Sequence, residues 1–163
     1  MADGQVVARY VEAPHVRFFT SLEQVCMHHR LELEDLETLG PRQILIVEDD
    51  ADTRDSLALL LAEEGYAVVT AKDGSEALEH LKRAARPDLI ILDLMMPILD
   101  GFEFRAAQRA VGGEVATIPV VVMSATLHTI SSSRAFKAMR ADAAVQKPFD
   151  AKDLLKIVAR LLR

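Results

Sequence analysis

The chain has 163 residues, of which 50% are hydrophobic and 27% charged, and its formal net charge is −6. This acidic balance argues against a nucleic-acid-binding surface, which needs clustered Lys and Arg, and no apolar run is long enough to span a membrane. Cys26 is the only cysteine, so an intramolecular disulfide and a cysteine-based zinc site are excluded. Because the N-terminus lacks a signal-peptide pattern, a cytoplasmic location is expected.

The first 42 residues differ in their residue pattern from the rest of the chain and are predicted to form an N-terminal extension. Its first part is weakly patterned, and Thr20–Glu23 then resembles a capping box. Apolar residues recur at helical spacing after it, which predicts a helix over 21–39. The apolar stripe of this helix requires cover, from its own domain or from a second protomer.

From residue 43 to the end, short apolar runs alternate with amphipathic segments. Strands are predicted over 44–47, 66–71, 89–92, 119–123 and 143–146, and helices over 52–64, 73–85, 101–111, 127–139 and from 150 onward. Such alternation implies right-handed crossovers and a parallel sheet covered on both faces. The expected fold is α/β, a doubly wound five-stranded parallel sheet over 43–163, with a helical N-terminal extension over 1–42.

The most informative stretch is 89–101. Leu89–Leu92 is a continuous apolar run and predicts a strand that is buried on both faces. Asp93 follows directly, at the carboxyl end of the strand, which is where open α/β sheets bind their ligands. Asp100 before Gly101 favours a turn and a helix start. This stretch therefore predicts a ligand-binding carboxylate at the mouth of the central strand.

Four more polar residues follow the other predicted strands, namely Glu48, Asp49, Ser124 and Lys147. Parallel strands end at one edge, so these side chains are expected to meet Asp93. Carboxylates about 4 Å apart repel by roughly 4 kcal/mol at an effective dielectric of 20, and hard oxygen ligands of this kind suit Mg²⁺. A cation beside a free carboxylate suits phosphoryl transfer. Asp93 would then be the nucleophile that forms an acyl phosphate, and Lys147 and Ser124 would bind the phosphoryl oxygens.

These residues, in this order, resemble the receiver domain of two-component response regulators over 43–163. The resemblance rests on Glu48-Asp49, on Asp93 with Met96-Pro97 and Asp100-Gly101, on Ser124-Ala125, and on Lys147-Pro148-Phe149. It implies a flavodoxin-like receiver fold, with Mg²⁺ held by Asp49, Asp93 and the backbone carbonyl of Met95, and with Glu48 acting through water. It further implies a histidine kinase or a histidine phosphotransfer protein as donor. By this resemblance the chain is a signalling receiver rather than an enzyme, limited to self-phosphotransfer and self-dephosphorylation.

The sequence departs from the receiver pattern at one position. Receivers usually carry an aromatic residue three positions before the lysine, which moves inward when the hydroxyl residue shifts towards the phosphoryl group, and here that residue is Ala144. Phe136 and Phe149 are the aromatic candidates to replace it. Met95 and Thr126 flank the site without a carboxylate or amide to orient an attacking water. Slow loss of the phosphoryl group is therefore expected.

Two other functions remain open at this point. A phosphatase of the haloacid dehalogenase type also uses a strand-end Asp and Mg²⁺, but it needs a second acid where this chain has Met95, and a cap insertion that is missing here. A receiver-like domain that takes no phosphate and serves as a docking or dimerisation module is the second alternative. Output is expected through a downstream protein target or through a homodimer formed by the N-terminal helix or the last helices, without direct nucleic-acid or membrane contact.

Overall fold

The computed structural model describes residues 8–12, 15–19, 40–83 and 86–163. The chain divides into two compact units, 1–40 and 41–163. The two domains predicted from the sequence, 1–42 and 43–163, remain a prediction. Among the described helices, none combines the length and the apolar character needed to cross a bilayer.

The described part of the first unit is a β-hairpin that the sequence analysis did not anticipate. Strand β1 (Ala8–Glu12) pairs antiparallel with β2 (His15–Phe19), and Val11 stands opposite Val16. β-Branched and aromatic residues in both segments were the available signal for strands. The helix predicted over 21–39 lies outside the described residues.

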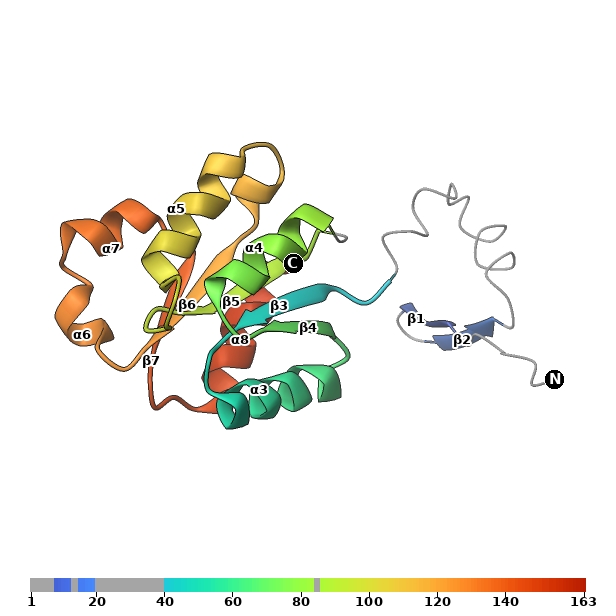
Figure 1. The fold of residues 1–163 in the computed structure, drawn as a ribbon. Helices are drawn as coiled ribbons and strands as arrows, with labels where there is room; N and C mark the ends of the chain where they lie inside the picture. The colour runs from blue at the N-terminus through green and yellow to red at the C-terminus, as the bar shows by residue number, and fades with distance from the viewer. Residues whose placement is uncertain (1–7, 13–14, 20–39, 84–85) are drawn as a thin grey trace. The chain divides into compact units, whose positions relative to one another are not determined.

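The second unit contains the predicted five-stranded parallel sheet, with strand order β4-β3-β5-β6-β7 (Figure 1). The strands are β3 (Gln43–Val47), β4 (Ala67–Ala71), β5 (Leu89–Asp93), β6 (Val120–Ser124) and β7 (Ala143–Gln146). The chain passes from β3 outward to β4 and then returns to β5 on the other side of β3. The strand order therefore reverses between β3 and β5, and ligands bind beyond the strand ends at such a switch point.

Helices cover both faces of this sheet, as predicted for a doubly wound fold (Figure 1). They are α3 (Ala51–Glu63), α4 (Gly74–Arg83), α5 (Gly101–Val111), α6 (Leu127–Ile130), α7 (Arg134–Met139) and α8 (Ala151–Leu161), with a short 3₁₀ helix η1 (Val115–Thr117) before β6. Helices α3 and α8 pack on one face, and α4, α5 and α7 pack on the other.

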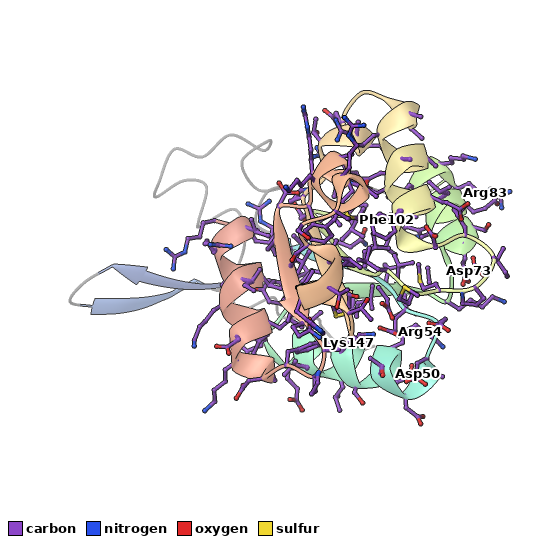
Figure 2. All side chains as sticks on the ribbon, turned by 90° about the vertical axis from the view of Figure 1, so that its left-hand side faces the viewer. Asp50, Arg54, Asp73, Arg83, Phe102 and Lys147 are labelled. Carbon is purple, nitrogen blue, oxygen red and sulfur yellow. The ribbon has the colours of Figure 1, made fainter. Side chains whose placement is uncertain are left out.

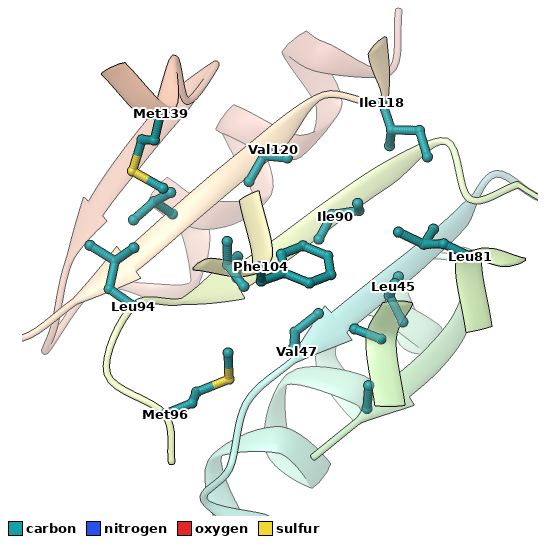
Figure 3. Packing of buried hydrophobic residues seen from close by; sticks show 14 residues of the cluster. Leu45, Val47, Leu81, Ile90, Leu94, Met96, Phe104, Ile118, Val120 and Met139 are labelled. Carbon is teal, nitrogen blue, oxygen red and sulfur yellow. The ribbon is translucent and has the colours of Figure 1, made fainter. Parts of the chain in front are cut away.

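The alternation of side chains along the strands explains these two layers. Leu45 points into the cluster with α4 and α5, while its neighbour Ile46 points into the cluster with α3 and α8. Phe104 of α5 is fully buried and lies between side chains of the central strands, as Figure 3 shows. Because both faces are covered, the central strands have no polar face, which accounts for their continuous apolar sequences.

One predicted helix is wrong. The segment 127–139 forms two short helices, α6 and α7, rather than one. Ser133 has an extended backbone, and its side chain accepts a hydrogen bond from the Phe136 N–H at 3.1 Å, so it caps a new helix. Serine competes for backbone hydrogen bonds in this way, which favours caps over helix interiors. The run of three serines over 131–133 was therefore a helix boundary.

Candidate functional site

Asp93 lies at the centre of the site. It is the last residue of β5, at the switch point of the sheet, and it is only 6% exposed. Its Oδ1 atom accepts a hydrogen bond from the Met95 N–H at 3.1 Å. Helix α5 begins directly behind it, because a Cβ atom at Gly101 would lie 2.6 Å from the Asp93 carbonyl oxygen. A glycine is thus required where the helix meets the strand end.

Two more carboxylates stand beside Asp93 at the end of β3. Glu48 is 1% exposed and Asp49 is exposed. One ligand oxygen from each of the three residues can be chosen so that all three lie within 4.8 Å of one another. The structure therefore brings together the three acidic side chains that the sequence analysis had singled out.

Lys147 connects the two buried carboxylates. Its Nζ atom donates a hydrogen bond of 2.7 Å to Glu48 Oε2 and another of 2.7 Å to Asp93 Oδ2. Burial lowers the pKa of Lys147, but the hydrogen bonds and charges of the two carboxylates outweigh burial, so this pKa is raised. The ammonium therefore stays charged and compensates part of the negative charge at the strand ends.

For the pKa of Glu48, in contrast, burial outweighs the hydrogen bond from Lys147. Burial raises the pKa of Glu48, and the nearby charge of Asp93 raises it further, while the hydrogen bond from Lys147 acts against both. The net pKa is raised, so the ionised form of Glu48 is disfavoured in the folded protein. A second cation near this carboxylate would relieve the same cost.

Arg54 holds the backbone of the acidic turn, a role that the sequence analysis missed. Its Nη1 atom donates hydrogen bonds to the carbonyl oxygens of Glu48, at 2.8 Å, and Asp49, at 3.2 Å. Arg54 and Asp50 both lie at the start of α3 (Figure 2). Asp50 caps this helix, and hydrogen bonds from Thr53 lower its pKa. A positively charged arginine in the first turn of a helix interacts unfavourably with the helix dipole. The position of Arg54 in the sequence therefore indicated that its side chain has a role outside the helix.

Ser124 lies at the same edge but is not bonded to the acidic group. It is fully buried at the end of β6, and its Oγ atom accepts from the Thr126 N–H at 3.1 Å and lies 3.3 Å from the Thr126 hydroxyl. In the described part of the chain, those are the hydrogen bonds of this hydroxyl. The structure therefore places Ser124 on the predicted edge, with its side chain turned to its own loop.

Met95 is 64% exposed, and the proposed role of its carbonyl stays a prediction. Ala144 is exposed, whereas Phe136 packs partly buried against the core cluster on the α5 and α7 side of the sheet, and Phe149 against the cluster on the α3 and α8 side. The bond between Lys147 and Pro148 is cis. Neither phenylalanine occupies the position of Ala144 on β7.

The acidic group suits a hard divalent cation. Ligand atoms of one Mg²⁺ lie about 2.0–2.1 Å from the ion and hence at most about 4.2 Å apart. The three carboxylates fall within 4.8 Å, and Asp49 is exposed and free of steric confinement by the core, so a small side-chain adjustment brings the set into range. All three donors are carboxylate oxygens, which favours Mg²⁺ over softer metals.

Known proteins share both the sequence pattern and the fold. The response regulator receiver domain family matches residues 44–159. Response regulator MprA of Mycolicibacterium vanbaalenii is 40% identical over 123 residues, which are 76% of this chain and 51% of that protein. Response regulator MprA of Mycobacterium leprae is 40% identical over 121 residues, 74% of this chain and 51% of that protein. The chain thus spans about half the length of the curated relatives that it matches.

Solved structures give the same result. The chemotaxis protein CheY4 of Vibrio cholerae superimposes with a TM-score of 0.68 at 33% identity, covering 76% of this chain and all of that one. The receiver domain of the sensor histidine kinase PA1611 of Pseudomonas aeruginosa, which has a magnesium ion coordinated in its active-site cleft, superimposes with a TM-score of 0.67 at 26% identity, covering 76% of this chain and 98% of that one.

Proposed function

Because this chain belongs to the response regulator receiver family, we propose that it accepts a phosphoryl group in a two-component or phosphorelay system and that Asp93 is the acceptor. The observation that carries this proposal is the pair of 2.7 Å bonds from Lys147 to Asp93 and Glu48. They set a buried nucleophilic carboxylate beside a fixed positive charge, and positioning and charge neutralisation are most of what phosphoryl transfer requires.

The proposed reaction uses the side chains in distinct roles. A carboxylate oxygen of Asp93 attacks the phosphorus of a phosphohistidine, a P–O bond forms, and the P–N bond breaks as the imidazole nitrogen leaves with its electron pair. Lys147 then donates hydrogen bonds to the phosphoryl oxygens, and Ser124 donates from the neighbouring strand. The donor is a histidine kinase or a histidine phosphotransfer protein.

A divalent cation completes the proposed site. Asp49, Asp93 and the Met95 carbonyl would hold Mg²⁺, with Glu48 acting through water. Mg²⁺ supplies charge neutralisation for the transferred phosphoryl group. The magnesium ion of the similar Pseudomonas receiver supports this assignment, and so do the three carboxylates gathered within 4.8 Å.

The test is intact-mass spectrometry of the full chain after incubation with acetyl phosphate, with and without Mg²⁺. We expect one phosphoryl adduct that requires Mg²⁺ and is lost in Asp93→Asn. Asp50→Asn is the matched control, because Asp50 is an exposed helix cap and Asn caps helices equally well. If the wild-type chain forms no adduct, the alternative of an unphosphorylated docking module takes precedence.

Loss of the phosphoryl group is proposed to be slow. Met95 offers a thioether and Thr126 a hydroxyl, and neither provides the carboxylate or amide that would orient a water molecule for attack. We expect the adduct to persist for minutes or longer after removal of acetyl phosphate. A half-life of seconds would contradict this. A downstream protein that distinguishes the two phosphorylation states is the proposed route of output.

A further inference from the structure

We propose that the side-chain amide of Gln146 couples the phosphorylation state of Asp93 to the position of helix α6. This inference rests on the proposed function, since it concerns how the phosphorylated site is read. It assigns to Gln146 the role of a positioning residue, which acts through the loop that carries Ser124 and does not itself touch the reacting atoms.

The Gln146 side chain forms hydrogen bonds with three backbone groups. Its Nε2 atom donates to the Ala125 carbonyl at 2.5 Å and to the Lys147 carbonyl at 3.0 Å. Its Oε1 atom accepts from the His128 N–H, in the first turn of α6, at 3.0 Å. We call this set of hydrogen bonds the Gln146 clasp. It ties the end of β7 to the loop after β6 and to the helix that follows that loop.

The strand register places the clasp beside the proposed reaction site. Gln146 stands opposite Ser124 in the parallel pair of β6 and β7. Lys147 follows it, donating its backbone N–H to the Ser124 carbonyl at 2.9 Å and its ammonium to Asp93. The loop that carries the hydroxyl is thus attached to residues 146 and 147 at two successive carbonyls, those of Ser124 and Ala125.

Residues two apart on a strand share a face. Gln146 and Ala144 therefore lie on the same face of β7. The methyl group of Ala144 cannot form hydrogen bonds and is too short to contact the loop, whereas the side chain of Gln146 extends to the loop and to α6. Of these two residues, only Gln146 can transmit a displacement of Ser124 across this face.

A phosphoryl group on Asp93 changes the hydrogen bonds that the loop after β6 must form. The Ser124 hydroxyl is bonded to Thr126 in the present structure, so serving a phosphoryl oxygen requires it to turn or shift towards Asp93. Ala125 follows directly in the chain, and its carbonyl is held by Gln146. A shift of Ser124 therefore strains the clasp, and the strain reaches α6 through the bond to His128.

Helix α6 is suited to respond. It has only four residues, no side-chain cap and no fully buried residue. The amide of His128, its second residue, is bonded to the Gln146 side chain. Besides the partly buried Ile130, which packs against the core, this neutral hydrogen bond helps to position the helix, and net contributions of such bonds are small.

The experiment follows amide hydrogen exchange over 125–130 in the full chain, before and after treatment with acetyl phosphate and Mg²⁺, with intact mass recorded in parallel. Gln146→Met keeps the length of the side chain and removes all three hydrogen bonds. In the untreated variant the His128 amide should exchange about threefold to tenfold faster, as expected for the loss of one neutral hydrogen bond. In wild type, phosphorylation should change exchange over 125–130, whereas the variant should form the adduct without that change.

Two further variants sharpen the result. Gln146→Glu keeps the acceptor for the His128 N–H and loses both donors, so it should protect the His128 amide but still uncouple α6 from phosphorylation. His128→Ala is the matched control, because the clasp uses only the backbone of His128, and it should behave like wild type.

Three outcomes would overturn the coupling. They are wild-type exchange of the His128 amide in untreated Gln146→Met, an undiminished response to phosphorylation in that variant, and a phosphorylated wild-type chain with unchanged exchange over 125–130. Failure of the proposed function is visible separately, as absence of the mass adduct in wild type, and the coupling would then fall with it.

Discussion

The edge formed by the strand ends consists of two halves that are held together by different forces. The acidic half comprises Glu48, Asp49, Asp93 and Lys147, at the ends of β3 and β5 and just after β7. The amide half comprises the loop 124–128 and Gln146. Charged hydrogen bonds hold the first half, and neutral ones hold the second.

This difference determines which half moves when phosphorylation changes the charge of the site. Hydrogen bonds to charged groups contribute about 1.5–3 kcal/mol each, and neutral ones about 0.5–1.5 kcal/mol. A phosphoryl group adds a charge of about −1.5 to −2 to the acidic half, which is backed by the buried apolar residues of β3 and β5. The amide half is followed by two short helices. Displacing the amide half therefore costs less free energy than displacing the acidic half.

Removal of Lys147 should have the largest effect on stability. Lys147→Met deletes two charged hydrogen bonds and leaves two neighbouring carboxylates without their shared cation, so without divalent ions the free energy of unfolding should fall by about 3 kcal/mol or more. Saturating Mg²⁺ should restore part of this loss, because it binds only the folded site. Denaturant unfolding with and without Mg²⁺ measures both quantities.

Lys156 provides the matched control for this experiment. Its ammonium also bonds a carboxylate, that of Asp153, at 2.9 Å, but both side chains are exposed. Exposed pairs of this kind contribute little, so Lys156→Met should leave the unfolding transition unchanged with and without Mg²⁺. Equal effects of the two variants would mean that burial does not strengthen the acidic half, and the contrast between the halves would be lost.

Glu48→Gln should change how stability depends on pH. The pKa of Glu48 is raised in the folded chain, first by burial, so the folded state binds this proton more tightly than the unfolded state does. Stability is then lost as pH rises from the unfolded pKa through the raised folded pKa. The variant has no such proton, and without Mg²⁺ its stability relative to wild type should increase over that range.

Thermal unfolding of both chains at a series of pH values from 4 to 8 measures this difference. The gain should be smaller with Mg²⁺, because a cation favours the ionised carboxylate of the wild type. A variant that becomes progressively less stable than wild type as pH rises would show that the bond to Lys147 dominates over burial.

The fold and the acidic half were largely predictable because both depend on local sequence. Continuous apolar runs marked β3, β5 and β6, which are buried on both faces. A parallel sheet brings all its carboxyl ends to one edge, so Asp93 and Glu48 were placed without knowledge of any contact. The family resemblance then supplied the chemistry.

The parts that were missed depend on contacts between distant residues. Arg105 lies on α5 where helical spacing gave no sign of a buried charge, yet it is 6% exposed and donates to the carbonyls of Met139 and Arg140. Burial lowers its pKa, although its hydrogen bonds are intact. Gln146 likewise depends on a loop about 20 residues away. No periodicity within a segment encodes such partners.

The smallest expected effect concerns the boundary between α6 and α7, where the sequence analysis predicted one helix. Ser133→Ala removes the cap of α7 at a cost of about 1 kcal/mol. Because α7 has six residues, of which only Met139 is buried, we expect faster amide exchange over 134–139 with little change in the melting temperature.

Asp100→Ala is the comparison for this variant. Asp100 caps α5 through a capping box with Glu103, and α5 carries the fully buried Phe104, which belongs to the core cluster with Val47 and Leu92. Loss of that cap should lower the melting temperature of the whole domain, since α5 cannot loosen without opening the core. If both variants acted globally and equally, α7 would be as firmly integrated as α5. The short helices that follow the amide half would then resist displacement as strongly as α5 does, against the contrast drawn between the two halves.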